Sequence, residues 1–194
     1  MIHIYTDGSC IKNPGPAAYA FVGLVAGRET ILCEKVGMWE HSTNQRAELQ
    51  AIVSSLQWAQ DLPRVWSQPA NVTVYSDSKY AIACLSEWWP KWKRDGWIRK
   101  RKGRTWPIKN LDLIQQGIAL QEVVKVSFQW VKGHSGNKWN EYVDEMANRA
   151  AARAYHEGNA DIGYEPEPPE SLLTAERDYE ERQRLFIAAI EKEG

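Results

Sequence analysis

The N-terminal part of the chain alternates apolar and polar residues with the period of a β-strand. This pattern predicts strands over residues 1–6, 17–25 and 29–38, with a turn at 13–16 after the first and a second turn around Gly27. Neighbouring strands joined by such short connections run antiparallel. The expected start of the fold is therefore an antiparallel three-stranded meander.

Beyond the meander, helical spacing and strand patterns alternate along the chain. Leu49, Ile52 and Leu56 recur at helical spacing on one face of a helix predicted over residues 43–60. The elements predicted after it are a strand at 71–75, helices at 78–88 and 110–122, a strand at 124–131 and a helix at 140–155. A meander followed by strand–helix crossovers predicts an α/β fold, a mixed five-stranded sheet with helices on both faces.

The C-terminal part differs in composition from the rest. Residues 156–170 are rich in Gly, Asn, Glu and Pro without an apolar period, which is typical of a linker. We expect one compact domain over residues 1–155, then this linker and a C-terminal helical extension at 171–194. The chain should be a monomer, with the extension as the candidate self-association element. Its apolar stripe consists of Leu172, Tyr179, Phe186 and Ile190.

The composition is that of a globular protein. Of 194 residues, 43% are apolar and 25% are charged, and no window approaches the roughly 20 consecutive apolar residues of a membrane span. Cys10, Cys33 and Cys84 are scattered, so neither a zinc site nor a disulfide framework is indicated. The N-terminal strand lacks the basic segment and long apolar run of a signal peptide. We expect a cytoplasmic protein with no membrane partner.

Charge is distributed unevenly along the chain. The net charge is only −1, but residues 91–104 are densely basic with one acid, Asp95, and acids dominate from Glu165 to the end. Trp92 and Trp97 lie among the basic residues. Cations and indoles in one segment favour contact with the phosphates and sugars of nucleic acid.

Four acids, Asp7, Glu48, Asp77 and Asp144, occur in distinct local motifs at strand ends or on helices. Asp7 and Asp77 follow predicted neighbouring strands, so both should lie near one edge of the sheet. Directing four acids at one point has little structural use, because like charges repel at close range. Divalent ions remove that repulsion. Oxygen ligands suit Mg²⁺, and two ions about 3.5–4 Å apart are common in phosphodiester chemistry.

Each acid alone also has a simpler interpretation. Asp7 precedes Gly8, as in many turns, while Glu48 and Asp144 would be ordinary solvated charges on their helices. Asp77 would cap the helix predicted to begin at residue 78. Together these interpretations require four coincidences, so we favour a shared metal site.

The motifs that contain these acids resemble, in order, those of type 1 ribonuclease H in its bacterial form. The resemblance covers residues 1 to about 155, and the motifs are highly specific only in combination. They are Tyr-Thr-Asp-Gly-Ser-Cys (5–10), Asn-Pro-Gly-Pro (13–16), Asn-Gln-Arg-Ala-Glu-Leu (44–49), Tyr-Ser-Asp-Ser-Lys-Tyr (75–80), Trp-Val-Lys-Gly-His-Ser-Gly (130–136) and Asn-Glu-Tyr-Val-Asp (140–144).

The resemblance implies a reaction and a set of catalytic residues. The reaction is endonucleolytic hydrolysis of the RNA strand of an RNA–DNA hybrid, which leaves 5′-phosphate and 3′-hydroxyl ends. Two Mg²⁺ ions per site would serve as cofactors, with Mn²⁺ as the alternative. The implied metal ligands are Asp7, Glu48, Asp77 and Asp144. His134 corresponds to a mobile histidine that assists proton transfer or product departure.

The resemblance also assigns the contacts with the hybrid. Side-chain amides both donate and accept hydrogen bonds, which suits the 2′-hydroxyls of the minor groove. The residues assigned there are Cys10, Asn13, Asn44, Gln45 and Asn110, where Gln45 replaces a second asparagine of the family. Residues 88–104 correspond to a basic protrusion, the handle, whose expected contacts are Trp92, Lys93, Arg94, Trp97, Lys100 and Arg101.

Three alternatives remain beside a free-standing hybrid-cleaving enzyme. A related enzyme of the same fold would act on DNA, like an integrase, but the amides at 44, 45 and 110 fit a hybrid reader. A non-catalytic hybrid-binding module would not need all four carboxylates. A domain of a reverse transcriptase is disfavoured by the start directly in the first strand and by the handle.

Overall fold

The computed structural model describes residues 1–62 and 71–158, apart from the side chain of Arg101. Its centre is a five-stranded sheet in the order β3-β2-β1-β4-β7. The antiparallel meander is β1 (Ile2–Cys10), β2 (Gly15–Val25) and β3 (Ile31–Ser42), and β4 (Asn71–Ser76) and β7 (Lys125–Trp130) continue the sheet parallel to β1. The predicted mixed sheet is confirmed.

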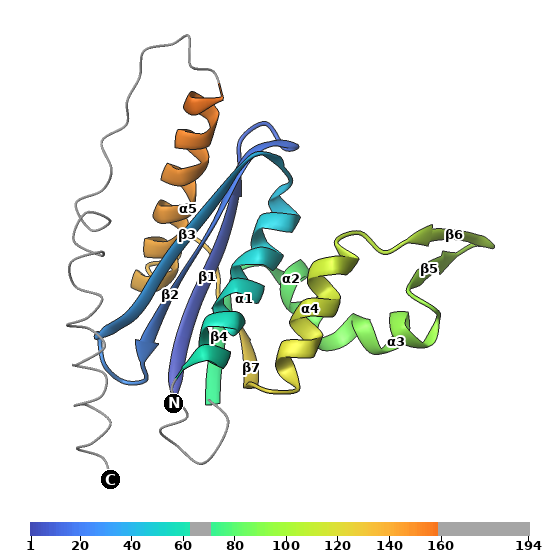
Figure 1. Cartoon of the computed structure of the whole chain (residues 1–194), viewed down its shortest axis with the longest axis horizontal. Coiled ribbons are helices and arrows are strands. Elements are labelled where there is room, and N and C mark those ends of the chain that lie inside the picture. The colour runs from blue at the N-terminus through green and yellow to red at the C-terminus, as the bar shows by residue number, and fades with distance from the viewer. Residues whose placement is uncertain (63–70, 159–194) are drawn as a thin grey trace.

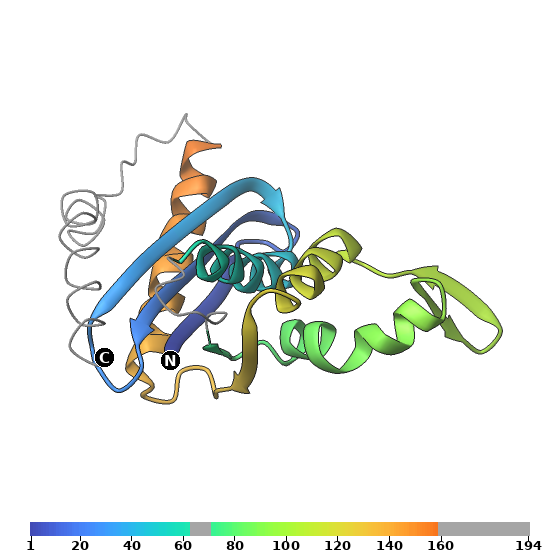
Figure 2. The same cartoon turned by 60° about the horizontal axis from the view of Figure 1, so that its bottom comes forward.

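Helices cover both faces of this sheet (Figures 1 and 2). α1 (Asn44–Asp61) lies on one face with α4 (Leu111–Gln121) beside it, and α5 (Lys138–Glu157) lies on the other face. The positions of these helices agree with the predicted ones. The predicted C-terminal extension lies outside the described residues, and the division into domain, linker and extension stays a prediction.

Two apolar clusters attach the helices to the sheet. On the α1 face, Ile4 and Phe21 of the sheet pack with Leu49, Ile52 and Leu56. On the α5 face, alternate residues of β2 pack against α5, namely Ala20, Val22 and Leu24 against Val143, Met146 and Ala147. Full burial of one large aliphatic side chain contributes about 1.5–3 kcal/mol. Successive side chains of β2 thus point to opposite faces of the sheet, with Phe21 toward α1 and Ala20 and Val22 toward α5.

Gly8 allows α1 to approach β1 closely. A Cβ atom at Gly8 would lie 2.3 Å from the backbone nitrogen of Glu48 and 2.5 Å from the carbonyl carbon of Ala47. Backbone atoms cannot move away as a flexible side chain can. A residue without a side chain is therefore required where the helix that carries Glu48 crosses the strand that carries Asp7.

The strand that contains Asp7 is longer than predicted. The prediction ended it at residue 6, but Gly8, Ser9 and Cys10 continue the ladder opposite Tyr19, Ala18 and Ala17. Backbone pairing with β2 therefore extends the strand through a sequence with no apolar alternation. Asp7 consequently lies within β1 and not after its end.

The segment after β4 projects away from the sheet (Figure 1). The helix predicted at 78–88 is present but continues: α2 (Lys79–Ala83) leads through a π-helical turn (Cys84–Trp88) into α3 (Trp89–Arg94). A hairpin of β5 (Ile98–Arg101) and β6 (Arg104–Pro107) follows, which the sequence pattern did not predict. Its turn, Lys102-Gly103, has φ values of 48° and 73°, as expected for a tight hairpin turn.

No helix in the two described stretches is both long and apolar enough to cross a membrane.

Candidate active site

The sheet topology brings three of the predicted acids together. Thr6 of β1 pairs with Ser76 of the parallel strand β4, so the residues that follow them, Asp7 and Asp77, lie side by side. Glu48 approaches both from α1. One ligand oxygen from each of these three carboxylates lies within 4.8 Å of the other two. The fourth acid, Asp144, is placed by α5 on the opposite face from α1.

Backbone and side-chain amides orient these carboxylates. The backbone N–H of Gly8 donates to Asp7 Oδ1 at 2.8 Å. Nδ2 of Asn44 donates to Glu48 Oε1, and Nδ2 of Asn140 donates to Asp77 Oδ2, both at 3.4 Å. These donors are neutral, so they orient the carboxylate oxygens but do not cancel the negative charge of the carboxylates.

Asp77 is not the helix cap that the simpler interpretation required. The N-cap of α2 is Ser78, whose Oγ accepts a hydrogen bond from the backbone nitrogen of Ala81 at 3.2 Å. The backbone carbonyl of Asp77 accepts from Trp130 Nε1 at 3.0 Å. This leaves the Asp77 carboxylate directed toward the other acids.

Burial and mutual repulsion dominate the electrostatics of this cluster. Asp7 is 5% exposed and Glu48 is 7% exposed. Burial, followed by the charge of Asp77, raises the pKa of Asp7 to about 8. Burial, followed by the charge of Asp7, raises the pKa of Glu48 well above its ordinary value. At neutral pH the cluster therefore holds protons unless another positive charge takes their place.

The cluster fits a divalent cation. Oε2 of Glu48 is buried and accepts no hydrogen bond from any residue that the structure describes. A buried carboxylate oxygen without a donor is costly, whereas a cation coordinated there would satisfy it. The converging donors are all carboxylate oxygens, the ligands that Mg²⁺ and Mn²⁺ prefer.

The loop that carries His134 passes close to the acids. A Cβ atom at Gly133 would lie 2.5 Å from Asp77 Oδ2, so the loop backbone packs against that carboxylate. Nδ1 of His134 lies 3.7 Å from Asp144 Oδ2, and the His134 side chain is 79% exposed. Asp144 also accepts from Asn148 Nδ2 at 2.9 Å. The structure thus pairs the predicted histidine with the fourth acid at the edge of the cluster.

Four of the five residues assigned to hybrid recognition have hydrogen-bonding contacts in the described structure. Oδ1 of Asn13 accepts from the backbone nitrogen of Asn44 at 3.2 Å, which ties the β1–β2 turn to the start of α1. Asn110 has a left-handed backbone (φ 56°) at the start of α4 and donates to Tyr80 Oη at 3.4 Å. Gln45 is exposed. The thiol of Cys10 faces carbonyl oxygens of its own chain, such as that of Ser42 at 3.6 Å.

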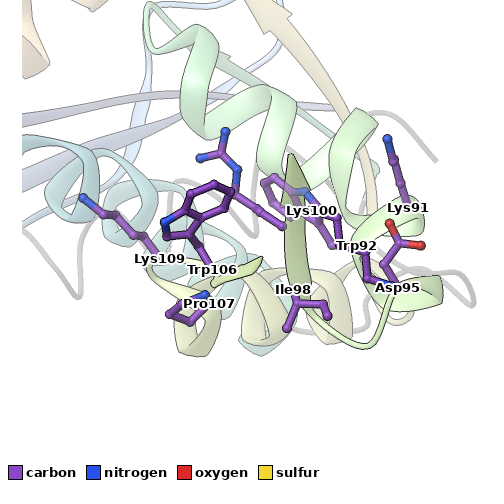
Figure 3. A pocket seen from close by; sticks show the side chains of 9 residues that line it. Lys91, Trp92, Asp95, Ile98, Lys100, Trp106, Pro107 and Lys109 are labelled. Atoms are coloured by element: carbon purple, nitrogen blue, oxygen red, sulfur yellow. The ribbon is translucent and has the colours of Figure 1, made fainter. Parts of the chain in front are cut away.

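The handle combines packed indoles with exposed cations. Trp92 is half-buried with its ring centroid 5.6 Å from that of Trp88, and Trp97 also packs against the core. Lys93, Arg94 and Lys100 are exposed, and the side chain of Arg101 lies outside the described structure. A hollow of about 550 Å³ lies between α3 and the hairpin, and Figure 3 shows the side chains that line it. Its lining includes Lys91, Trp92, Arg99, Lys100, Trp106 and Lys109.

Sequence reasoning missed Asn140. This residue is 1% exposed, and its side chain contacts Asp77. Its position four residues before Asp144 places both on the same face of α5. A polar residue one turn before a candidate ligand was the available signal, but in sequence alone it looks like an ordinary solvated helix residue.

The chain resembles known ribonucleases H in sequence and in structure. The family model "RNase H" matches residues 1–152. A ribonuclease H from Cupriavidus pinatubonensis is 40% identical over 149 residues, which cover 77% of this chain and 94% of that protein. The N-terminal RNase H domain of a Mycobacterium tuberculosis protein, solved as a fusion with maltose-binding protein, matches with a TM-score of 0.62 at 27% identity, covering 80% of this chain and 96% of that one.

A more distant structure shares the fold. LC11-RNase H1, solved in complex with an RNA/DNA hybrid, matches with a TM-score of 0.59 at 20% identity, covering 79% of this chain and 99% of that one.

Removing the charge of Asp7 should stabilise the metal-free protein. The folded pKa of about 8 lies above the ordinary value, so the stability contributed by the protonated form is fully present below about pH 4 and is lost as the pH rises toward 8. Asp7→Asn should raise the metal-free melting temperature near neutral pH and flatten its pH dependence. Each 1 kcal/mol of relief corresponds to about 2–4 °C.

Thermal unfolding in chelator across this pH range measures the effect, with the exposed Asp61→Asn as the matched control. A pH dependence of Asp7→Asn that is indistinguishable from wild type would contradict the electrostatic description of the site.

Proposed function

The chain belongs to the ribonuclease H family of nucleases, and we propose that it hydrolyses the RNA strand of RNA–DNA hybrids by a two-metal-ion mechanism. The observation that carries this proposal is the convergence of Asp7, Glu48 and Asp77, with a buried Glu48 oxygen that has no hydrogen-bond donor among the described residues. A fold alone does not identify a reaction, so the proposal is supported by the acidic cluster together with the family match.

Asp7, Glu48, Asp77 and Asp144 would hold the ions, with Mg²⁺ preferred and Mn²⁺ as the alternative. Ions bound there supply activation of a water molecule and stabilisation of the leaving 3′ oxygen, which gives 5′-phosphate and 3′-hydroxyl ends. The carboxylates act as ligands and not as nucleophiles. The backbone of Gly8 and the amides of Asn44 and Asn140 keep the ligand oxygens in fixed directions.

His134 would move protons at the rim of this site. Its ring is largely exposed and lies in a short loop between Gly133 and Gly136, which suits a side chain that moves during turnover. Its Nδ1 atom lies 3.7 Å from Asp144 Oδ2, at the edge of the acidic cluster. From this position a protonated ring would donate a proton to a departing product oxygen.

Recognition of the hybrid would involve two separate surfaces. Asn44, Gln45 and Asn110, which we call the amide set, would read the 2′-hydroxyls of the RNA strand together with the β1–β2 turn around Asn13. The exposed cations of the handle would contact phosphates, which steers and holds the duplex without reading its sequence. This division favours a hybrid nuclease over a DNA nuclease of the same fold. The intact set of acids argues against a purely binding module.

Hybrid cleavage should require divalent metal and the carboxylates. We expect the full chain to cut the RNA of a hybrid, and to leave RNA duplex, DNA duplex and single-stranded RNA largely uncut, with no cutting in chelator. Asp77→Asn should abolish turnover in a folded protein, while Asp61→Asn should not. Near-normal turnover of Asp77→Asn, or equal cleavage of DNA duplex, would remove the basis of this assignment.

Loss of the His134 ring should slow turnover more than it weakens binding. General acid–base assistance is worth about 10²–10⁴-fold, and assistance limited to product departure would be worth less. Steady-state kinetics of His134→Ala at saturating hybrid measures kcat separately from KM. An unchanged kcat would show that His134 has no catalytic role.

Neutralising the handle should weaken hybrid binding and flatten its salt dependence. Replacing Lys93, Arg94, Lys100 and Arg101 by Gln should raise KM with little change in kcat, because each lost phosphate contact removes about one unit of log–log salt slope. The matched control neutralises Lys35, Lys125, Arg149 and Arg153, which lie outside the proposed surface. If both quadruple variants show the same salt slope, the handle cations do not contact the duplex.

A further inference from the structure

A bidentate ion pair joins the first turns of two helices beside the active site. Arg46 lies in the first turn of α1, and Asp112 lies in the first turn of α4. Nη1 of Arg46 donates to Asp112 Oδ1 at 3.0 Å, and Nη2 donates to Oδ2 at 2.5 Å. This parallel geometry uses the planar fork of arginine and is directional in a way that a lysine contact is not.

The location of Arg46 is not explained by the stability of its own helix. The N-terminus of a helix carries a partial positive charge, so a cation in the first turn is unfavourable. The first turn of α1 contains no acid that would offset it. Asp112, by contrast, has the favourable sign for the first turn of α4. The cation of α1 is thus placed for a contact with another element.

The contact between α1 and α4 that lies behind their first turns is apolar. Val53 of α1 faces the buried Gly117 of α4, and Leu49 and Ile114 belong to the same core cluster. Such contacts hold two helices at a set distance but have little directionality along the helix axes. The Arg46–Asp112 pair adds a directional contact at the end of both helices nearest the active site.

The residues beside this pair are those of the amide set. Asn44 and Gln45 immediately precede Arg46, and Asn110 lies two residues before Asp112. The left-handed backbone of Asn110 depends on its surroundings, because this conformation is unfavourable for residues other than glycine. The two halves of the amide set are therefore carried by different helices, and the ion pair links them.

We propose that the Arg46–Asp112 pair is a positioning element that sets the spacing between the two halves of the amide set, and thereby the fit to the RNA–DNA hybrid. The proposal rests on the proposed function, since it concerns how the same site reads its substrate. Neither residue is catalytic. Each acts through its neighbours, because the guanidinium and the carboxylate are directed at each other.

The competing interpretation is that Arg46 contacts a phosphate of the substrate directly. The two interpretations predict opposite effects for Asp112. If the pair positions the amide set, removing either partner has the same consequence and removing both adds nothing. If Arg46 binds phosphate, removing Asp112 frees the cation, so hybrid binding tightens and its salt dependence steepens.

The test compares full-length Arg46→Ala, Asp112→Ala, the double variant and the charge reversal Arg46→Asp/Asp112→Arg with wild type. Arg153→Ala is the matched control, because it breaks a surface pair with Glu157 of similar exposure on the far part of α5. Hybrid and DNA-duplex binding are measured by anisotropy in chelator at several salt concentrations, and cleavage kinetics are measured with Mg²⁺.

We expect each single variant and the double variant to weaken hybrid binding and raise KM by about two- to fivefold, the size expected for a partly exposed pair. kcat and the salt slope should stay unchanged, DNA-duplex binding should change less, and the charge reversal should restore most of the loss. Tighter binding by Asp112→Ala, additive effects in the double variant, or behaviour equal to Arg153→Ala would overturn the proposal. Failure of wild type to cut the hybrid would instead overturn the proposed function.

Discussion

The central constraint on this structure is that the fold must hold several carboxylates close together although they repel one another. The parallel register of β1 and β4 sets Asp7 beside Asp77, and α1 adds Glu48 from one face of the sheet. The donors to Asp7 and Glu48 are amides, so the negative charge is oriented but not cancelled. In a folded protein without cations this arrangement raises pKa values and costs stability. A divalent cation bound among these carboxylates would offset that cost.

The rest of the fold serves to offset that cost while holding the acids in place. Apolar clusters on both faces of the sheet attach α1 and α5, and each of these helices carries one of the four predicted ligands in its N-terminal half, Glu48 on α1 and Asp144 on α5. Gly8 allows the backbone of α1 to approach β1, and Gly133 allows the loop backbone to approach the Asp77 carboxylate, in both cases where a Cβ atom would collide. The hairpin of the handle projects away from the sheet (Figure 2), whereas Trp92 and Trp97 of the handle pack against the core.

The sequence predicted the parts of the fold that side-chain periodicity determines. The meander, the crossovers and the helix positions all follow from apolar spacing. The extension of β1 beyond residue 6 does not, because backbone pairing with β2 and not side-chain pattern produces it. The β5–β6 hairpin was missed because its described side chains are largely exposed and present no apolar face. The four acids could be predicted because each lies in a recognisable motif. The contact of Asn140 with Asp77 and the Arg46–Asp112 pair could not, because each joins residues of different elements that are far apart in the sequence.

Proton release on metal binding tests the central claim most directly. Calorimetric titration of Mg²⁺ into metal-free protein near neutral pH, in buffers of different ionisation enthalpy, counts the protons displaced. We predict release of about one proton per protein, because burial and the charge of Asp77 raise the pKa of Asp7 to about 8, so this carboxyl group is mostly protonated near neutral pH until a cation binds. Binding of Mg²⁺ at these residues without any proton release would contradict it.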